Sequence, residues 1–343
     1  MITVDGSQME GGGQLLRMAT TYSCILQKPI HFINIRGKRR NPGLSPQHLA
    51  TLKAAAKLCS ADLRGAGLGS TEIELHPGAL KGGIHTIDIG TAGSVSLMLQ
   101  CLAPMLILNN EPSTLSIRGG TAVKWSPPIP FLQNVVYPAL GEMGADINLH
   151  LERHGFYPKG GGDVTFDSRP VKALRPFQPD PPSVDKVKGV SICGNLPSHV
   201  AERQARAAKK ILNGQDLSAE VAVETVQSSS PGSVIVLWAE GVFIGSDSHG
   251  DRGKPAEKVG SEAAKSLISQ IRTGAHVDRN TGDHLILPCS LADGVSEFRV
   301  SELTLHTLSA IEMAKKFTGC NVVVDGKIGK PARVEITGIG HVA

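Results

Sequence analysis

Residues 5–17 bring three consecutive glycines, a carboxylate directly before them and one arginine into a short stretch, and this combination suits a phosphate ligand. An apolar strand at residues 2–4 should run into the glycines at 11–13, where a helix begins. Glycines let backbone N–H groups crowd an anion, and the start of the helix adds unpaired donors. Glu10 beside them indicates a divalent metal carried with a nucleotide, because such metals take few protein ligands. The alternative is a plain strand-to-helix turn that needs small residues.

A basic stretch at residues 36–40 is a second candidate phosphate site, with four cations in five positions after an apolar strand at 31–35. Arginine side chains hold phosphate oxygens in a bidentate manner, so Arg36 and Arg39 are candidate ligands. A solvated basic loop is the alternative, since most charge runs are of that kind.

Glycine turns and one histidine complete the candidates. Turns at residues 90–94 and 157–162, with a weaker copy at Gly294, would suit a polyanionic ligand by converging on one cleft. His306 begins a predicted helix, as His48 does earlier in the chain, and it is either a nucleophile or a helix cap. The chain has no phosphate-binding P-loop and no kinase signature, so any nucleotide site is of another type.

Composition limits the class of protein. The net charge of +4 permits an anionic partner, while 4% aromatic residues argue against a sheet-face platform for single-stranded nucleic acid. Phosphate contacts should therefore carry most of any RNA affinity. The six cysteines are scattered without a Cys-x-x-Cys pair, which gives no zinc signature and is typical of a reducing compartment. The longest apolar run, at residues 96–108, is too short to span a bilayer, so we expect a cytoplasmic protein without a membrane partner.

An internal repeat organises these motifs into a fold. Three segments, closed by Ser60, Gly144 and Gly319, each read as a helix, a small-residue stop and a strand. Pro138 should kink the second of these helices. The helix ends at Ser60 and Gly144 are 84 residues apart, whereas those at Gly144 and Gly319 are 175 apart. A segment of about 90 residues is therefore inserted before the third repeat. The alternative is chance similarity among helix ends.

Prolines cluster between residues 169 and 183, where the interruption should begin. After them, the pattern predicts a small α/β domain with strands at 187–193, 219–226 and 234–238 and helices at 199–212 and 255–272. We therefore predict core repeats one and two at residues 1–182, the inserted domain at 183–278 and core repeat three at 279–343.

Taken together, these motifs resemble those of the RNA 3′-terminal phosphate cyclase family, and the resemblance covers essentially the whole chain. The shared motifs are DGSQMEGGGQLLR at 5–17, RGKR at 36–39, PGLSPQH at 42–48, GGIH at 82–85, TAGS at 91–94, HGFYPKGGG at 154–162 and TLHT at 304–307. The resemblance implies an α/β fold with a core of βαβαββ-type repeats, similar to enolpyruvyl transferases, and a small thioredoxin-like insert. It also implies an enzyme of the ATP-dependent ligase class. With ATP and a divalent metal, Mg or Mn, such an enzyme turns an RNA 3′-terminal phosphate into a 2′,3′-cyclic phosphate.

Residue by residue, the resemblance implies that His306 attacks the α-phosphorus of ATP and carries AMP as histidyl-AMP. The RNA 3′-phosphate then takes the AMP, and the 2′-hydroxyl closes the cyclic phosphate and expels AMP. Glu10 would hold the metal. The residues implied to grip the triphosphate or the RNA phosphate are Arg17, Arg36, Arg39 and Gln47. Those implied to bind the adenylate are Gln14, Gln100, Asp283, Pro127, Phe131, Asn280 and His284.

Two positions depart from the family pattern. Asn280 stands where bacterial members have a tyrosine that stacks on the base, and His284 replaces a glutamine. Two rival classes share the architecture: a non-catalytic relative that acts in ribosome assembly, and the enolpyruvyl transferases. The first lacks the nucleophilic histidine and the second has no need of the TLHT motif, whereas this chain has both. The sequence leaves open the physiological RNA, the role of the insert, the metal used in the cell and the oligomeric state, a homodimer included.

Overall fold

A βαβαββ arrangement opens the chain, which a computed structural model describes over residues 1–343. Its elements are β1 (Ile2–Asp5), α1 (Gly13–Leu26), β2 (Ile30–Ile33), α2 (Pro46–Leu58), β3 (Asp62–Arg64) and β4 (Ile73–His76). The sheet order is β1-β2-β4-β3, in which β1 and β2 are parallel and the other neighbours are antiparallel.

The second copy has the same topology. Its elements are β5 (Gly83–Asp88), α3 (Val95–Ile107), β6 (Ser113–Gly119), α4 (Ile129–Phe131), the π-helical turn η1 (Leu132–Val136), α5 (Tyr137–Glu142), β7 (Asp146–Arg153) and β8 (Gly162–Arg169). The sheet order β5-β6-β8-β7 repeats that of the first copy, with the same parallel first pair.

The third copy begins late in the chain and has a shortened first strand. Its elements are α8 (Arg279–Leu291), β13 (Val295–Val300), α9 (Leu305–Thr318), β14 (Asn321–Gly326) and β15 (Ala332–Thr337). The sheet order is β13-β15-β14, and a single parallel bridge from Val277 to Val300 stands where the other copies have a full strand. The predicted three-repeat α/β core is therefore confirmed.

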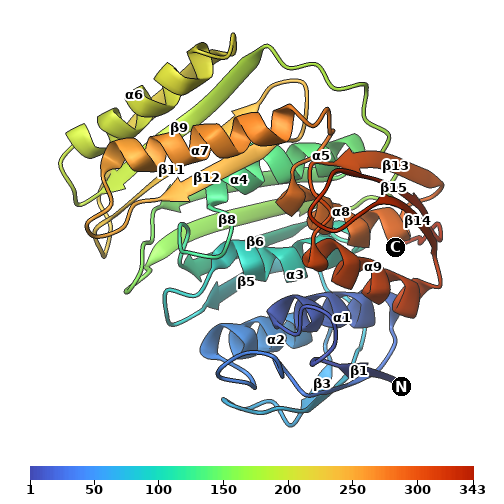
Figure 1. Ribbon diagram of the computed structural model, residues 1–343. Helices are drawn as coiled ribbons and strands as arrows, with labels where there is room; N and C mark the ends of the chain where they lie inside the picture. The colour runs from blue at the N-terminus through green and yellow to red at the C-terminus, as the bar shows by residue number, and fades with distance from the viewer.

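Between the second and third copies lies a separate four-stranded sheet with two helices. Its elements are β9 (Lys186–Gly194), α6 (His199–Asn213), β10 (Ser218–Val226), β11 (Gly232–Ala239), β12 (Gly245–His249) and α7 (Ala256–Ile271). The sheet order is β10-β9-β11-β12. Helices α6 and α7 pack against each other over this sheet (Figure 1), and a cluster of 15 buried apolar residues lies among these elements. The sequence pattern predicted each of them except β12; the domain boundaries remain a prediction.

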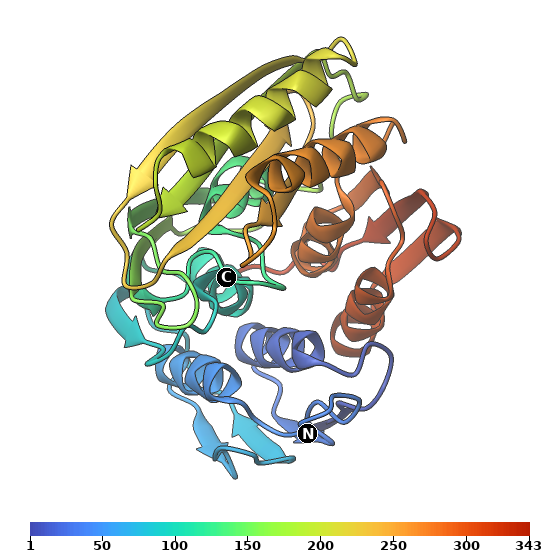
Figure 2. The ribbon, with the colours of Figure 1, turned by 60° about the vertical axis from the view of Figure 1, so that its left-hand side comes forward.

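Helices of all three copies face a common interior. In Figure 2 the small sheets lie on the outside of the core, and their helices point inward. Helix α1 packs against α2, α3 and α9, and α8 packs against α9. A main core of 73 buried apolar residues joins the copies. Loops that open these helices are thereby brought near one another, although they are far apart in the sequence.

The predicted helix stops are confirmed by the backbone. Ser60, Gly144 and Gly319 have φ values of 49°, 90° and 71°, the left-handed conformation of a helix C-cap. Pro138 produces a π-helical turn rather than a simple kink: it lies just after η1, at the start of α5. Proline lacks an N–H, so the helix loses a regular bond there and widens. No helix of the structure is long and apolar enough to span a membrane.

Candidate active site

Glu10 lies in the loop before α1, where its carboxylate already occupies an anion-binding position. Its side chain is only 6% exposed and pairs with the guanidinium of Arg39. The backbone N–H of Gly12, the N-cap of α1, donates to Glu10 Oε2 at 2.7 Å, and Glu10 N–H donates to Ser309 Oγ at 3.2 Å. The predicted cradle therefore binds a carboxylate through a helix N-terminus, which is how it would bind phosphate.

Polar N-caps fix the starts of the other helices that carry predicted site residues. Thr304 accepts a hydrogen bond from Thr307 N–H at 3.0 Å in α9. Ser94 accepts from Leu97 N–H at 3.1 Å in α3. In α8, Asp278 accepts from two backbone N–H groups of the first turn, each at 2.8 Å. Such caps stabilise a helix by about 1 kcal/mol each, and they set where the first-turn side chains point.

His306, the second residue of α9, ends a chain of hydrogen bonds that runs through α1 to α8. Its Nδ1 lies 2.8 Å from Gln14 Oε1, and Gln14 Nε2 donates to Asp283 Oδ2 at 3.0 Å. Because the amide oxygen can only accept, Nδ1 carries the ring proton and Nε2 keeps its lone pair. Nε2 lies 3.9 Å from Glu10 Oε1. The ring is thus oriented with its basic nitrogen toward the cradle.

Electrostatics keep His306 neutral. Burial lowers its pKa from the usual 6.5, and the cations of Arg17 and Arg39 lower it further. Half of the side chain, 51%, remains exposed, so the ring is accessible to a ligand. A neutral, accessible imidazole with a free nitrogen is the form that acts as a nucleophile.

Arg17 is a partly buried cation that acts on several of these groups. Its Nε donates to Gln100 Oε1 at 3.0 Å, which joins α1 to α3. Burial lowers its pKa to about 10, so the guanidinium stays charged at neutral pH. With burial, this charge contributes to a pKa of about 4 for His284 and about 3 for His48.

Asp283 has the opposite shift, because burial raises its pKa to about 7, against the attraction of Arg17. An unfolded chain releases this proton near the ordinary value of 3.8. The folded state thus gains stability from Asp283 at low pH and loses it as the pH rises through about 7, where a buried carboxylate must ionise.

We expect Asp283→Asn to raise the free energy of unfolding by about 1–3 kcal/mol at pH 8, where the wild type carries the buried charge. The difference should largely vanish at pH 3, where Asp283 is protonated in both states. Urea unfolding at the two pH values measures it, with the exposed Asp180→Asn as the matched control. An equal effect of Asp283→Asn at both pH values would contradict the assignment.

Two of the three predicted glycine turns lie against each other. A Cβ added to Gly160 would lie 2.8 Å from the Ala92 Cα, so the turn at 157–162 packs on the turn at 90–94. Gln47 reaches the second turn, where its Oε1 accepts from Ser94 N–H at 3.1 Å. Gly294 does not join them: it packs against Pro176 beyond the C-terminal end of α8.

His48 is a site residue that sequence reasoning left without a role. A Cβ added to Gly13 would clash with His48 Nε2 and lie 3.1 Å from Arg17 Nη1, so both side chains face the start of α1. Ser45 Oγ holds the other ring nitrogen of His48 at 2.5 Å. His48 lies in the PGLSPQH motif, which could have marked it as a candidate site residue. The sequence alone does not distinguish it from a histidine that merely opens a helix, whereas its contact with the cradle does.

Arg36 is less directly placed. Its Nη1 donates to the carbonyl of Gly43 at 2.9 Å, which holds the guanidinium against its own loop. Its charge still acts on the site, since it contributes to the lowered pKa of His48.

The residues implied to contact adenine do not all lie together. Gln100, Asp283 and His284 line one small cavity of about 40 Å³ between α1, α3 and α8. Asn280 is exposed at the start of α8. Phe131 is only 1% exposed and packs against Gly245, so it offers no free face to a ligand here. Pro127 is half-buried in the loop before α4.

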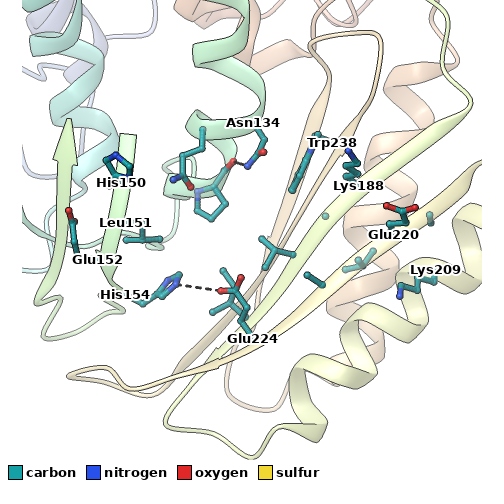
Figure 3. Close-up of a pocket in the computed structure, with 18 residues that line it drawn as sticks. Asn134, His150, Leu151, Glu152, His154, Lys188, Lys209, Glu220, Glu224 and Trp238 are labelled. Carbon is teal, nitrogen blue, oxygen red and sulfur yellow. Dashed lines mark hydrogen bonds and ion pairs between the residues drawn. The ribbon is translucent and has the colours of Figure 1, made fainter. Parts of the chain in front are cut away.

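A much larger cavity lies elsewhere. It has a volume of about 960 Å³ and lies between the second repeat and the separate sheet, lined among others by His150, Lys188 and Trp238. Figure 3 shows the contact that crosses it, from His154 Nε2 to Glu224 Oε2 at 4.0 Å. No predicted site residue lines this cavity.

Comparison with known proteins places the chain in one family. The model of the family described as RNA 3′-terminal phosphate cyclase matches residues 8–324. Proteins named RNA 3′-terminal phosphate cyclase are similar along nearly their whole length: that of Pyrobaculum aerophilum is 42% identical over 345 residues and that of Ignicoccus hospitalis 44% over 349, each covering 99% of both chains. That of Pyrococcus furiosus is 42% identical over 339 residues and covers 98% of both.

One solved structure, the enolpyruvyl transferase NikO from Streptomyces tendae, covers 98% of this chain and 82% of that chain at 10% identity. Its TM-score of 0.20 is too low to support an argument. The family match and the relatives agree with the motifs that surround Glu10 and His306. The chain belongs to the RNA 3′-terminal phosphate cyclase family.

Proposed function

We propose that this chain uses ATP to convert an RNA 3′-terminal phosphate into a 2′,3′-cyclic phosphodiester, releasing AMP and pyrophosphate. The observation that carries the proposal is the orientation of His306: Nδ1 is bound to Gln14 and Nε2 faces Glu10 at 3.9 Å. The names of the relatives support the same activity.

In the first step, His306 Nε2 attacks the α-phosphorus of ATP, forming a P–N bond as the P–O bond to pyrophosphate breaks. Gln14 holds the Nδ1 proton in place, so the ring becomes a cationic histidyl-AMP whose charge the nearby Glu10 carboxylate stabilises. The lowered pKa of His306 keeps the lone pair available at neutral pH.

In the second step, an oxygen of the RNA 3′-phosphate attacks the same phosphorus and breaks the P–N bond, which returns neutral His306 and leaves AMP on the RNA. In the third step, the vicinal 2′-hydroxyl attacks the RNA phosphorus, loses its proton and expels AMP. This step needs no external nucleophile, because the hydroxyl is already held beside its target.

Cations and amides around the cradle are suited to the phosphates. Arg17 and Arg39 lie on either side of the Gly12–Gly13 turn, where a Cβ added to either glycine would touch one of the two guanidinium groups. Their forks would hold phosphate oxygens in pairs, whereas Arg36 and Gln47 would act from the adjoining loops. Arg39 must leave Glu10 to do so.

Glu10 fits a divalent metal that arrives with the triphosphate rather than one resident in the protein. The structure holds no group of three or more His, Cys, Asp or Glu side chains arranged for a metal. One nearly buried carboxylate is the typical protein share for Mg²⁺ or Mn²⁺, which keep phosphate oxygens and water as further ligands. When bound, the metal supplies charge neutralisation of the phosphates.

The adenosine would lie toward α8. Gln100, Asp283 and His284 gather there, with Asn280 at the start of the helix, and we assign Pro127, in the loop before α4, to the same ligand. We assign Phe131 a supporting position behind this wall, because its ring is buried. We also propose that residues 183–278 form a domain of their own between the core segments 1–182 and 279–343, and that the protein acts in the cytoplasm.

Cyclisation of an RNA oligonucleotide that carries a labelled 3′-phosphate tests the proposal. The wild type should convert the label to a phosphatase-resistant end only with ATP and Mg²⁺ or Mn²⁺ present. A parallel incubation with α-labelled ATP, without RNA, should label the protein. Absence of both products would reject the enzyme and favour a non-catalytic, RNA-binding relative.

A further inference from the structure

Large aromatic side chains are scarce in this chain, and two of them are on the surface. The chain has two Trp and three Tyr. Tyr22 and Tyr137 are buried and Trp238 is half-buried, whereas Trp125 is 95% exposed and Tyr157 is 75% exposed. Exposed aromatic rings gathered on neighbouring loops can mark a binding surface.

Trp125 and Tyr157 lie on two closed loops that run side by side. The loop at 121–129 is closed by a 3.0 Å hydrogen bond from Ile129 N–H to the Thr121 carbonyl. A second loop, at 156–160, is closed at its ends by Gly160 N–H and the Phe156 carbonyl at 2.8 Å.

These loops are joined at their bases. Thr121 N–H donates to the Gly155 carbonyl at 2.9 Å, and a parallel bridge links Ala122 to Phe156. Trp125 has φ = 64°, a left-handed conformation that a bulky residue rarely adopts. This conformation carries a backbone cost, and the side chain that it presents is 95% exposed.

The two loops border the proposed active site. Gly160 packs on Thr91 and Ala92, in the turn whose Ser94 N–H binds Gln47. Pro127, which the proposal assigns to the adenosine, follows Trp125 by two residues in the same loop. The loop that carries Tyr157 therefore adjoins the turn that contacts Gln47, and the loop of Trp125 is joined to it.

The charges beside the rings suit a nucleic acid backbone. Lys124 precedes Trp125, and its Nζ is held by Asp251 at 2.6 Å. Lys159, two residues after Tyr157, is exposed and makes no ion pair. Aromatic faces flanked by lysines are the usual means of binding single-stranded RNA without sequence preference.

We infer that Trp125 and Tyr157 form a stacking platform for the bases next to the 3′ end of the RNA, with Lys159 contacting a phosphate between them. This inference rests on the proposed function, and it assigns two loops rather than a sheet face as the stacking surface. Base stacking on such rings is sequence-tolerant, because every base has an aromatic face.

The test measures cyclisation at saturating ATP for Trp125→Ala, Tyr157→Ala and the double variant, with RNA 3′-phosphates of one, two and eight nucleotides. We expect KM for the eight-nucleotide RNA to rise about tenfold in each single variant and about 100-fold in the double one, with kcat changed less than twofold. For the one-nucleotide substrate the variants should match the wild type. Trp125→Phe should retain most of the affinity.

Ile84→Ala is the matched control, because Ile84 is an apolar side chain, 85% exposed, on β5 and outside both loops. A second readout needs no turnover: in a Trp238→Phe background Trp125 is the only tryptophan, and RNA added without ATP should quench its fluorescence.

Unchanged KM for RNA in the double variant, with an active wild type, would overturn the platform and leave the proposed function standing. A rise in KM for ATP instead would assign the rings to adenine and also overturn it. A wild type that fails to cyclise any RNA would reject the proposed function, and absence of quenching would then reject the platform independently.

Discussion

Replacing His306 by alanine should lower both ATP-dependent labelling of the protein and RNA cyclisation by at least about 10⁴-fold, as loss of a covalent nucleophile does in other enzymes. No other imidazole in the site can take over. His48 also faces the cradle at Gly13 and His284 lines the small cavity by α8, but of these three rings only that of His306 pairs with Glu10, at 3.9 Å.

Labelling with α-labelled ATP measures this loss directly, and the label on the wild type should be acid-labile and sensitive to hydroxylamine. His199→Ala is the matched control, because His199 also opens a helix and is exposed, yet belongs to the separate sheet. Alanine at position 306 should leave thermal unfolding nearly unchanged, since half of the side chain is exposed. Undiminished label in the His306 variant would exclude it as the nucleophile.

Arg17→Met should slow histidyl-AMP formation by about 10²–10³-fold and also change its pH dependence. The arginine charge helps to lower the pKa of His306, and removing it raises that pKa. Because only the neutral ring attacks, the acid limb of the rate profile should move to higher pH. The pKa of Asp283 should rise above about 7 for the same reason, since Arg17 attracts its carboxylate.

A rate profile from pH 5 to 9 with saturating ATP separates charge from geometry. Arg17→Lys keeps the cation but loses the Nε bond to Gln100, so its acid limb should stay near that of the wild type while the rate remains low. A Met variant whose acid limb does not move would show that burial and Arg39, and not Arg17, set the pKa of His306.

Most of the fold was predictable because it repeats. The helices end at Ser60, Gly144 and Gly319 because of local conformational preferences, and such preferences can be recognised in a single sequence. The first strand of the third repeat was not predictable, because it is reduced to one bridge at Val277. The π-helical turn before Pro138 was also missed, since its wider ring depends on packing as well as on the missing N–H.

The sequence nominated the candidate site residues but gave none of the contacts between them. Family resemblance supplied His306, Gln14 and Asp283, yet it did not show that their side chains form one hydrogen-bonded chain. His306 and Gln14 are 292 residues apart, so only the packing of α1 against α9 brings them together. The buried face of Phe131 was hidden for the same reason: it depends on Gly245, from a strand that the sequence pattern did not indicate.

The hydrogen bond between Glu10 and Ser309 spans 299 residues, and it gives the protein an order of assembly. During synthesis at roughly 5–20 residues per second, about 15–60 s separate the emergence of the cradle from that of the α9 histidine. Until α9 emerges, a nascent chain therefore holds the cradle without His306, the proposed nucleophile. Under the proposed mechanism, adenylyl transfer becomes possible only once α9 has been synthesised, and a nascent chain without α9 should not consume ATP.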